Sequence, residues 1–154
     1  MISPAFSKNK MSPEISNVVT CFLESEGKIL ILKRSSKVGT YQGKWAGVSG
    51  YMPSKKTTGR DTTPEQQALK EINEETSLAA EEVELLKKGK PVMVKDEKLN
   101  KEWKIYPFMF RVKTPDKIKI DWEHSETIWI KPEDMEKYDT VPNLKETFQS
   151  ISEV

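Results

Sequence analysis

The stretch that decides the fold of this chain is TPEQQALKEINEETSL, at residues 63–78. Thr63 is a typical N-cap residue, Pro64 suits the first helical position, and Gln66 completes a capping box with Thr63. Together these signals predict a helix that begins at Pro64 and runs to about Thr76. Its apolar stripe consists of Ala68, Leu69 and Ile72. We expect this stripe to pack against a sheet.

The same helix carries three carboxylates on one side, because Glu74 and Glu75 follow Glu71 at the i,i+3 and i,i+4 positions. Like charges at this spacing cost roughly 0.2–0.5 kcal/mol per pair, and negative charge is unfavourable at a helix C-terminus. A bound divalent cation would remove the penalty. Oxygen ligands without His or Cys favour Mg²⁺ or Mn²⁺ over zinc. On spacing alone, a solvated acidic face is an equally good interpretation.

Upstream of the helix, the chain is rich in β-forming residues. Asn17–Glu24 and Lys28–Arg34 are predicted strands, and the turn residues Ser25–Gly27 between them indicate a hairpin. The glycine-rich stretch 35–50 is interpreted as a loop followed by a short strand. The polar stretch 51–61 is interpreted as an exposed loop.

Downstream of the helix, further strand signals alternate with short polar stretches. The predicted strands are Val83–Lys88, Pro91–Lys95, Trp103–Val112, Ile118–Ile120 and Thr127–Ile130. A helical turn is expected at Lys131–Tyr138. A C-terminal helix is expected at Pro142–Ile151, with Leu144, Phe148 and Ile151 on one face. Strands on both sides of one central helix indicate an α+β fold with helices on a mixed or antiparallel sheet.

Composition excludes several classes of protein. The chain has 154 residues with 25 Lys+Arg and 24 Asp+Glu, so one domain at 17–154 without a basic nucleic-acid footprint is expected. Residues 1–16 are polar and are interpreted as a flexible lead-in rather than a signal peptide. The single Cys21 and single His124 exclude a disulfide framework and any site that needs two histidines. No apolar run could span a membrane, and a cytoplasmic location is expected.

The acidic helix also has a family context. Gly50, Thr63–Glu65 and the run Lys70–Leu78 resemble the Nudix box, G-x5-E-x7-R-E-U-x-E-E-x-G-U, in which U is aliphatic. The preceding strand at 28–34 and the late acidic stretch at 123–126 are similar to neighbouring parts of Nudix hydrolases. The resemblance implies a Nudix-type α/β/α sandwich, with a mixed β-sheet core on which the box helix packs.

The chain departs from the box at several positions. Lys70 stands where the pattern has Arg, Ser77 where it has Gly, and Thr62 where it has the early Glu. The loop from Gly50 to the helix is also longer than the pattern allows. Lys70 keeps the charge but lacks the planar fork of Arg, and Ser77 is expected to strain the helix end.

The resemblance implies hydrolysis of a nucleoside diphosphate derivative with Mg²⁺ (or Mn²⁺). Glu71 and Glu75 are then the first metal ligands, and Glu74 is a third ligand or a catalytic residue that hydrogen-bonds a metal-bound water. A backbone carbonyl near Ser49–Gly50 could complete the metal's ligands. Glu123 is the candidate general base or an additional ligand.

Substrate contacts are less sharply indicated. Arg34 could bind phosphate, and a surface ion pair is the alternative. Trp45 and Tyr106 are candidate substrate contacts, as are Trp103, Phe108 and Trp122, although core packing is the better explanation for each aromatic residue taken alone. His124 is interpreted as a loop residue rather than a catalyst.

Three other functions remain open. A Nudix-fold module that binds a nucleotide without cleaving it would explain the changes at Thr62, Lys70 and Ser77. An enzyme of the isopentenyl diphosphate isomerase type would need a pocket cysteine, for which Cys21 is poorly placed. A structural or interaction protein is supported only by the high surface charge. The expected partner is a small nucleotide derivative, with no nucleic acid and no membrane, and a homodimer is an open prediction.

Overall fold

The computed structural model describes residues 14–53 and 61–152. Its first four strands are β1 (Glu14–Ser25), β2 (Lys28–Arg34), β3 (Trp45–Ala46) and β4 (Val48–Tyr51). The later strands are β5 (Val83–Lys88), β6 (Val92–Asp96), β7 (Lys101–Val112) and β8 (His124–Ile130). The helices are α3 (Pro64–Thr76) and α4 (Leu144–Ser152), and short 3₁₀ turns lie at Ala80–Glu82, Pro115–Lys117 and Pro132–Lys137.

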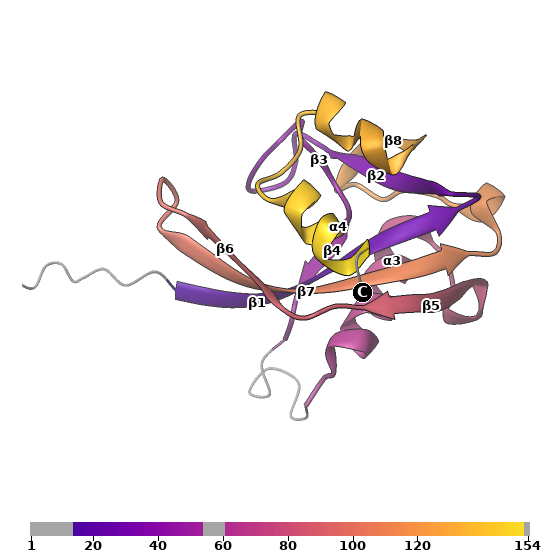
Figure 1. The fold of residues 1–154 in the computed structure, drawn as a ribbon, viewed down its shortest axis with the longest axis horizontal. Helices are drawn as coiled ribbons and strands as arrows, with labels where there is room; N and C mark the ends of the chain where they lie inside the picture. Colours follow the sequence, from indigo (N-terminus) through magenta and orange to yellow (C-terminus); the bar gives the residue numbers. More distant parts are fainter. Residues whose placement is uncertain (1–13, 54–60, 153–154) are drawn as a thin grey trace, which may run out of the picture.

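These strands form one mixed sheet around β1. The main path runs β3-β2-β1-β7-β5, while β4 pairs with β1, β6 with β7 and β8 with β2. β1 and β7 are parallel along their whole length, with Cys21 opposite Phe108, whereas the other pairs are antiparallel. The long β1–β7 pair crosses the whole molecule, and the β6–β7 hairpin extends from one end of it (Figure 1).

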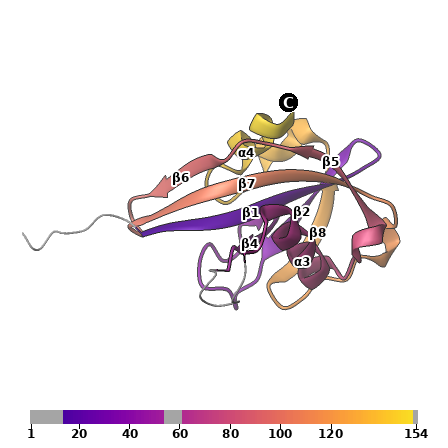
Figure 2. The same cartoon turned by 90° about the horizontal axis from the view of Figure 1, so that it is seen from below.

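Helices cover both faces of this sheet. Within β2, Leu30 and Leu32 join the apolar cluster that includes Ile72 of α3, whereas Ile29 and Ile31 join the cluster of α4. Successive side chains of a strand point to opposite faces, so these four buried apolar residues contribute alternately to the cluster under α3 and to the cluster under α4. Figure 2 shows α3 on one side of the sheet and α4 on the other. The predicted α+β fold with an α/β/α arrangement is confirmed.

The start of α3 follows the sequence signals. The Thr63 hydroxyl accepts a hydrogen bond from the backbone N–H of Gln66 at 3.1 Å, and the Gln66 side chain accepts one from the Thr63 N–H at 3.0 Å. Ala68 and Ile72 are buried against the sheet. Leu69 is only half-buried at the edge of the same cluster, so the apolar face is narrower than expected.

Some predicted boundaries were wrong. Ile118–Ile120 is not a strand, because its backbone bonds to the end of α3 rather than to a strand among the described residues: the Lys119 N–H donates to the Thr76 carbonyl at 2.9 Å. Ile118 and Ile120 pack against the core. β8 begins earlier than predicted, at His124. β1 begins at Glu14, inside the predicted lead-in, of which residues 1–13 lie outside the described part of the chain. Residues 54–60 of the predicted exposed loop also lie outside it. No helix in the described residues is long and apolar enough to cross a membrane.

Candidate active site

The acidic side of α3 lies directly against β4. A Cβ atom placed on Gly50 would fall 2.0 Å from the carboxyl carbon of Glu71, so any other residue at position 50 would displace this carboxylate. One oxygen of Glu71 accepts a hydrogen bond from the Gln67 side chain at 2.6 Å. The carboxylate is thereby held over the backbone of β4.

Glu75 is more deeply buried, with 1% of its side chain exposed. Its Oε2 atom has no hydrogen-bond partner among the described residues. Burial raises the pKa of Glu75 well above the usual value, and the nearby carboxylates of Glu123 and Glu71 raise it further. Burial likewise raises the pKa of Glu71. Two buried carboxyl groups therefore lie one turn apart, and the charge of Glu71 disfavours ionisation of Glu75.

His124 lies behind this pair. Its Nε2 is 3.7 Å from Glu75 Oε1 and its Nδ1 is 3.7 Å from Asp121 Oδ1, which is longer than a hydrogen bond in both cases. Burial lowers the pKa of His124 to about 4, so the ring is neutral at physiological pH. The interpretation of His124 as a loop residue was wrong, because it opens β8 and is buried between β8 and α3.

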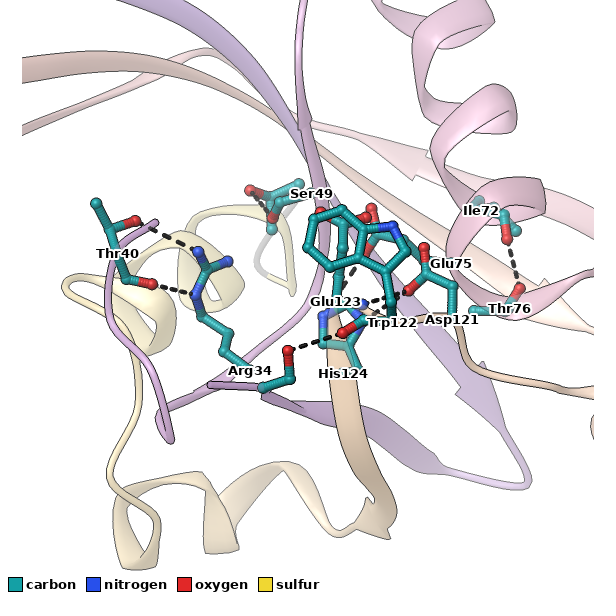
Figure 3. A network of polar contacts seen from close by, with 12 residues as sticks. Arg34, Thr40, Ser49, Ile72, Glu75, Thr76, Asp121, Trp122, Glu123 and His124 are labelled. Carbon is teal, nitrogen blue, oxygen red and sulfur yellow. Dashed lines mark hydrogen bonds and ion pairs between the residues drawn. The ribbon is translucent and has the colours of Figure 1, made fainter. Parts of the chain in front are cut away.

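The turn before β8 brings Glu123 to the same place. Ser35 anchors this turn, since its hydroxyl donates to the Trp122 carbonyl at 2.7 Å and its N–H donates to the Glu123 carbonyl at 2.8 Å. Burial and the adjacent Asp121 carboxylate raise the pKa of Glu123 to about 7. Glu123 can therefore exchange a proton near neutral pH. Figure 3 shows the indole of Trp122 in front of Glu123, next to Asp121 and Glu75.

Arg34 closes the opposite side of this polar group. Its Nε donates to the Thr40 carbonyl at 2.9 Å and its Nη2 contacts the Thr40 hydroxyl at 3.3 Å (Figure 3). Burial lowers the pKa of Arg34, while the charges of Glu123 and Glu75 act against that shift. The guanidinium remains a cation at any physiological pH.

A cavity of about 670 Å³ joins these residues. Its polar lining comes from β2, β4, α3 and the turn before β8, and includes Arg34, Ser49, Gly50, Glu71, Glu74, Asp121 and Glu123. Its aromatic lining comes from the β2–β3 loop, β4, β7 and the same turn before β8, and consists of Tyr41, Tyr51, Trp103 and Trp122. The cavity thus has an acidic side and an aromatic side.

Most of the candidate residues from the sequence meet here. Arg34, Glu71, Glu74 and Glu123 line the cavity, and Glu75 lies behind Glu71 next to His124. The sequence analysis did not single out Tyr41, Tyr51 or Asp121. The sequence offers only one indication of their role: Tyr51 follows Gly50, Asp121 precedes Glu123 by two positions, and Tyr41 lies in the glycine-rich loop.

Trp45 and Tyr106 do not line this cavity. Trp45 packs edge-on against Tyr138, with ring centroids 5.7 Å apart, beside the cluster under α4. Tyr106 packs near the first turn of α3, where it lines a second cavity with Leu69 and Phe108. As for Trp103, the structure places it on the aromatic side of the main cavity.

Comparison with known proteins agrees with this geometry. The model of the NUDIX domain matches residues 14–151. The chain belongs to the NUDIX domain family.

Solved structures show the same fold at low sequence identity. A MutT protein from Methanosarcina mazei Go1 is 21% identical, with a TM-score of 0.73 over 91% of this chain and 94% of that chain. A MutT Nudix hydrolase from Burkholderia pseudomallei is 20% identical, with a TM-score of 0.65 over 89% and 98%. An Ap4A hydrolase from C. elegans is 15% identical, with a TM-score of 0.65 over 88% and 93%. Family and fold support pyrophosphohydrolase activity in general.

The departures from the Nudix box have visible consequences. Lys70 Nζ lies 4.0 Å from Glu74 Oε2, with 62% of its side chain exposed. Ser77 caps α3 in the left-handed region at φ 68°, where its N–H donates to the Asn73 carbonyl. Thr62 lies in the coil just before the helix. The expected strain at Ser77 is therefore present in the backbone.

Nudix proteins generally use divalent metal ions, and the residues present fit such an ion. Oε2 of Glu75, which has no hydrogen-bond partner among the described residues, and the Glu71 carboxylate over Gly50 are oxygen atoms that a divalent cation could bind. Within the described ranges, no three His, Cys, Asp or Glu residues are gathered closely enough to hold an ion by themselves. Mg²⁺ is often held by one or two carboxylates plus waters and substrate phosphates, so a carboxylate pair suffices.

Proposed function

We propose that this protein is a Mg²⁺- or Mn²⁺-dependent hydrolase that cleaves the pyrophosphate linkage of a nucleoside diphosphate derivative. The observation that supports it most directly is the buried pair Glu71 and Glu75, with one oxygen unpartnered, beside a cavity that contains Arg34 and Glu123. A cavity of about 670 Å³ with an acidic and an aromatic side suits a molecule of nucleotide size. The protein is proposed to act in the cytoplasm.

Glu71 and Glu75 would hold the metal, with Glu74 at the rim of the cavity as a third ligand or a catalytic residue. Glu74 suits that position because it lines the cavity with 49% of its side chain exposed. When bound, the ion would offset phosphate charge and lower the pKa of a coordinated water.

The chain's own residues supply the remaining chemistry. Glu123, with a pKa of about 7, would accept a proton from the attacking water as a general base. Arg34 would bind a phosphate oxygen, and its hydrogen bonds to Thr40 hold the guanidinium in a defined orientation. The turn anchored by Ser35 keeps Glu123 opposite the acids of α3.

The test is a panel of nucleotide sugars, dinucleotides and nucleoside triphosphates with Mg²⁺, in which released phosphate or nucleoside monophosphate is measured. Glu71→Gln and Glu75→Gln should weaken Mg²⁺ binding in calorimetry and abolish turnover. Glu81→Gln is the matched control, because Glu81 is exposed and does not line the cavity. Equal Mg²⁺ affinity in the wild type and both site variants would contradict the proposal.

A nucleotide-binding module without hydrolysis is the second candidate. The observation in its favour is Lys70, which among the described ion pairs is paired only with the exposed Glu74 and not with the buried Glu71 or Glu75. This candidate requires nucleotide binding with no product anywhere in the panel, including for Lys70→Arg. An isomerase of the isopentenyl diphosphate type is disfavoured, because Cys21 is fully buried against Ala68 and does not line the cavity.

A further inference from the structure

One hydrogen bond joins two distant parts of the chain at the aromatic side of the cavity. The Tyr41 hydroxyl donates to Asp96 Oδ2 at 2.6 Å, which connects the β2–β3 loop to the end of β6. The other oxygen of Asp96 accepts from the backbone N–H of Leu99 at 3.2 Å. Asp96 is therefore a fixed acceptor within its hairpin, and Tyr41 is the residue that reaches it.

Tyr41 is held in an unfavourable backbone conformation. Its φ of 53° lies in the left-handed region, which a bulky aromatic residue rarely adopts. Such strain persists only where surrounding contacts over-determine it, and it is frequent at ligand sites. The hydrogen bond to Asp96 is one of these contacts. Burial and this hydrogen bond raise the pKa of Tyr41, so the hydroxyl remains a donor.

The ring of Tyr41 also supports Trp103 on β7. Their ring centroids are 6.3 Å apart with an interplanar angle of 55°. The Trp103 indole N–H in turn points to the Tyr51 hydroxyl at 3.4 Å. Tyr41, Tyr51 and Trp103 all line the cavity, and we call these three residues the aromatic wall.

The polar atoms of the aromatic wall contact each other or Asp96. A ligand in the cavity would therefore meet the wall through ring surface, most of it from Tyr51, which is 56% exposed, because Trp103 is only 9% exposed. The wall borders the same cavity as Glu71 and Arg34, and Thr40, which orients Arg34, directly precedes Tyr41. A planar aromatic group joined to a phosphate chain would therefore fit across the cavity. Base–aromatic stacking is sequence-tolerant, because every base has a π-face.

We propose that Tyr41, through its hydrogen bond to Asp96, is a positioning residue that holds the aromatic wall for stacking on the nucleobase of the substrate. This inference rests on the proposed function for the identity of the substrate. It assigns base affinity to stacking on the exposed ring of Tyr51, which Trp103 contacts, and assigns the placement of Trp103 to the Tyr41–Asp96 pair.

The test compares the affinities of AMP and ribose 5-phosphate, measured by calorimetry. These two probes differ only by the base, and neither contains a phosphoanhydride that the protein could cleave. AMP should bind roughly 5- to 100-fold more tightly, which is the usual range for stacking one base. Equal affinities would overturn the aromatic wall as a base site, whatever the panel of substrates shows.

Tyr41→Phe isolates the positioning step, because it keeps the ring and removes the hydroxyl. The AMP preference should fall by roughly 2- to 10-fold, the range expected from one hydrogen bond, with ribose 5-phosphate affinity unchanged. Asp96→Ala should have the same effect, whereas Asp96→Asn keeps an acceptor and should retain more of the preference. Tyr138→Phe is the matched control, since Tyr138 packs against Trp45 away from the cavity.

The outcomes separate this inference from the proposed function. A preference for AMP that depends on Tyr41, without any turnover in the panel, would support the aromatic wall and contradict the hydrolase. Turnover with a preference that Tyr41→Phe leaves intact would overturn the positioning role alone. An equal loss of affinity for both probes would also overturn it, because it would mean that Tyr41 merely supports the fold.

Discussion

The two sides of the cavity are built in different ways. On the acidic side, Glu71 and Glu75 come from one turn of α3 and are buried with raised pKa values, and Oε2 of Glu75 has no partner among the described residues. On the aromatic side, Tyr41 and Trp103 come from distant segments, and each has a partner for its polar atom. A ligand must complete the first side, whereas the second is complete within the fold. The acidic side is therefore expected to govern the reaction and its dependence on metal and pH, and the aromatic side to govern stability and ligand affinity.

The largest expected effect is on turnover and belongs to the acidic side. Glu123→Gln should lower kcat by about 10²–10⁴-fold with little change in KM, because it removes a proton acceptor used in the transition state. Steady-state kinetics on whichever substrate the panel identifies will measure this. Glu126→Gln is the control, since Glu126 is an exposed residue of β8 that contacts only Lys33, at 4.0 Å, among the described ion pairs. A rise in KM with unchanged kcat would instead assign Glu123 to substrate binding.

The second effect concerns the aromatic side. Trp103 is 9% exposed, so Trp103→Ala should lower the free energy of unfolding by about 3 kcal/mol. Urea denaturation with a chelator and with Mg²⁺ should give the same loss, because the aromatic wall does not depend on the metal. Trp122→Ala is the comparison variant, because Trp122 is 60% exposed, and its effect should stay within about 0.5 kcal/mol. If Mg²⁺ abolished the difference between wild type and Trp103→Ala, the two sides would not be independent.

The third effect is a pH dependence on the acidic side without metal. The pKa of Glu75 is raised in the folded state, so the folded protein binds this proton more tightly than the unfolded chain does. Its contribution to stability is therefore present below the ordinary value of 4.5 and is lost as the pH rises above it. Glu75→Gln removes this titration, so the variant should gain stability relative to wild type as the pH rises.

Denaturation in chelator at about pH 5 and about pH 8 will measure the difference between the two proteins. The pKa of His124 is lowered to about 4, so His124 adds stability as the pH rises from there toward 6.5. This trend is opposite to that of Glu75 and is present in both proteins, so the quantity to compare is the stability of Glu75→Gln minus that of wild type at each pH. A difference that does not change with pH would mean that Glu75 titrates normally in the folded protein. At about pH 8, saturating Mg²⁺ should make wild type more stable than Glu75→Gln, because the proposed ion would bind the wild-type carboxylates and not the amide.

A feature of the fold or of the site could be predicted from the sequence where the residues that produce it are neighbours in the chain. The capping box of Thr63 and Gln66 and the spacing of Glu71, Glu74 and Glu75 are contained within one helix, so their pattern was sufficient. Ile118–Ile120 has a strand-like composition, but pairing requires a neighbouring edge that the sequence does not reveal.

The aromatic residues show the same limit more clearly. Trp45 and Tyr106 were predicted as substrate contacts and Trp103 was one of the further candidates, but only Trp103 lines the main cavity. The direction in which a strand faces decides between them. The Tyr41–Asp96 hydrogen bond joins residues 55 positions apart, and no local pattern indicates such a pair. The burial of His124 likewise results from the packing of β8 against α3.

The smallest expected effect is at the C-terminal end of α3, where the acidic side begins. Ser77 adopts φ 68°, a conformation that costs an L-residue roughly 1–2 kcal/mol and costs glycine little. Ser77→Gly should relieve this strain but lose the hydrogen bond that the Ser77 hydroxyl donates to the Lys119 carbonyl at 3.1 Å. The net result should be a gain of about 0.5 kcal/mol in the free energy of unfolding.

Thermal and urea denaturation of Ser77→Gly will measure this gain, with Ser77→Ala as the control that loses the hydroxyl and keeps the strain. Ser77→Ala should be less stable than wild type by about 1 kcal/mol, so the two variants should fall on opposite sides of it. If both were destabilised equally, the hydroxyl contact would dominate and the left-handed conformation would cost little here. Glu74 and Glu75 lie in the turn that Ser77 ends. If Ser77→Gly bound Mg²⁺ more tightly than wild type, the backbone strain at Ser77 would, like the charge repulsion, lower the affinity of these acids for the ion.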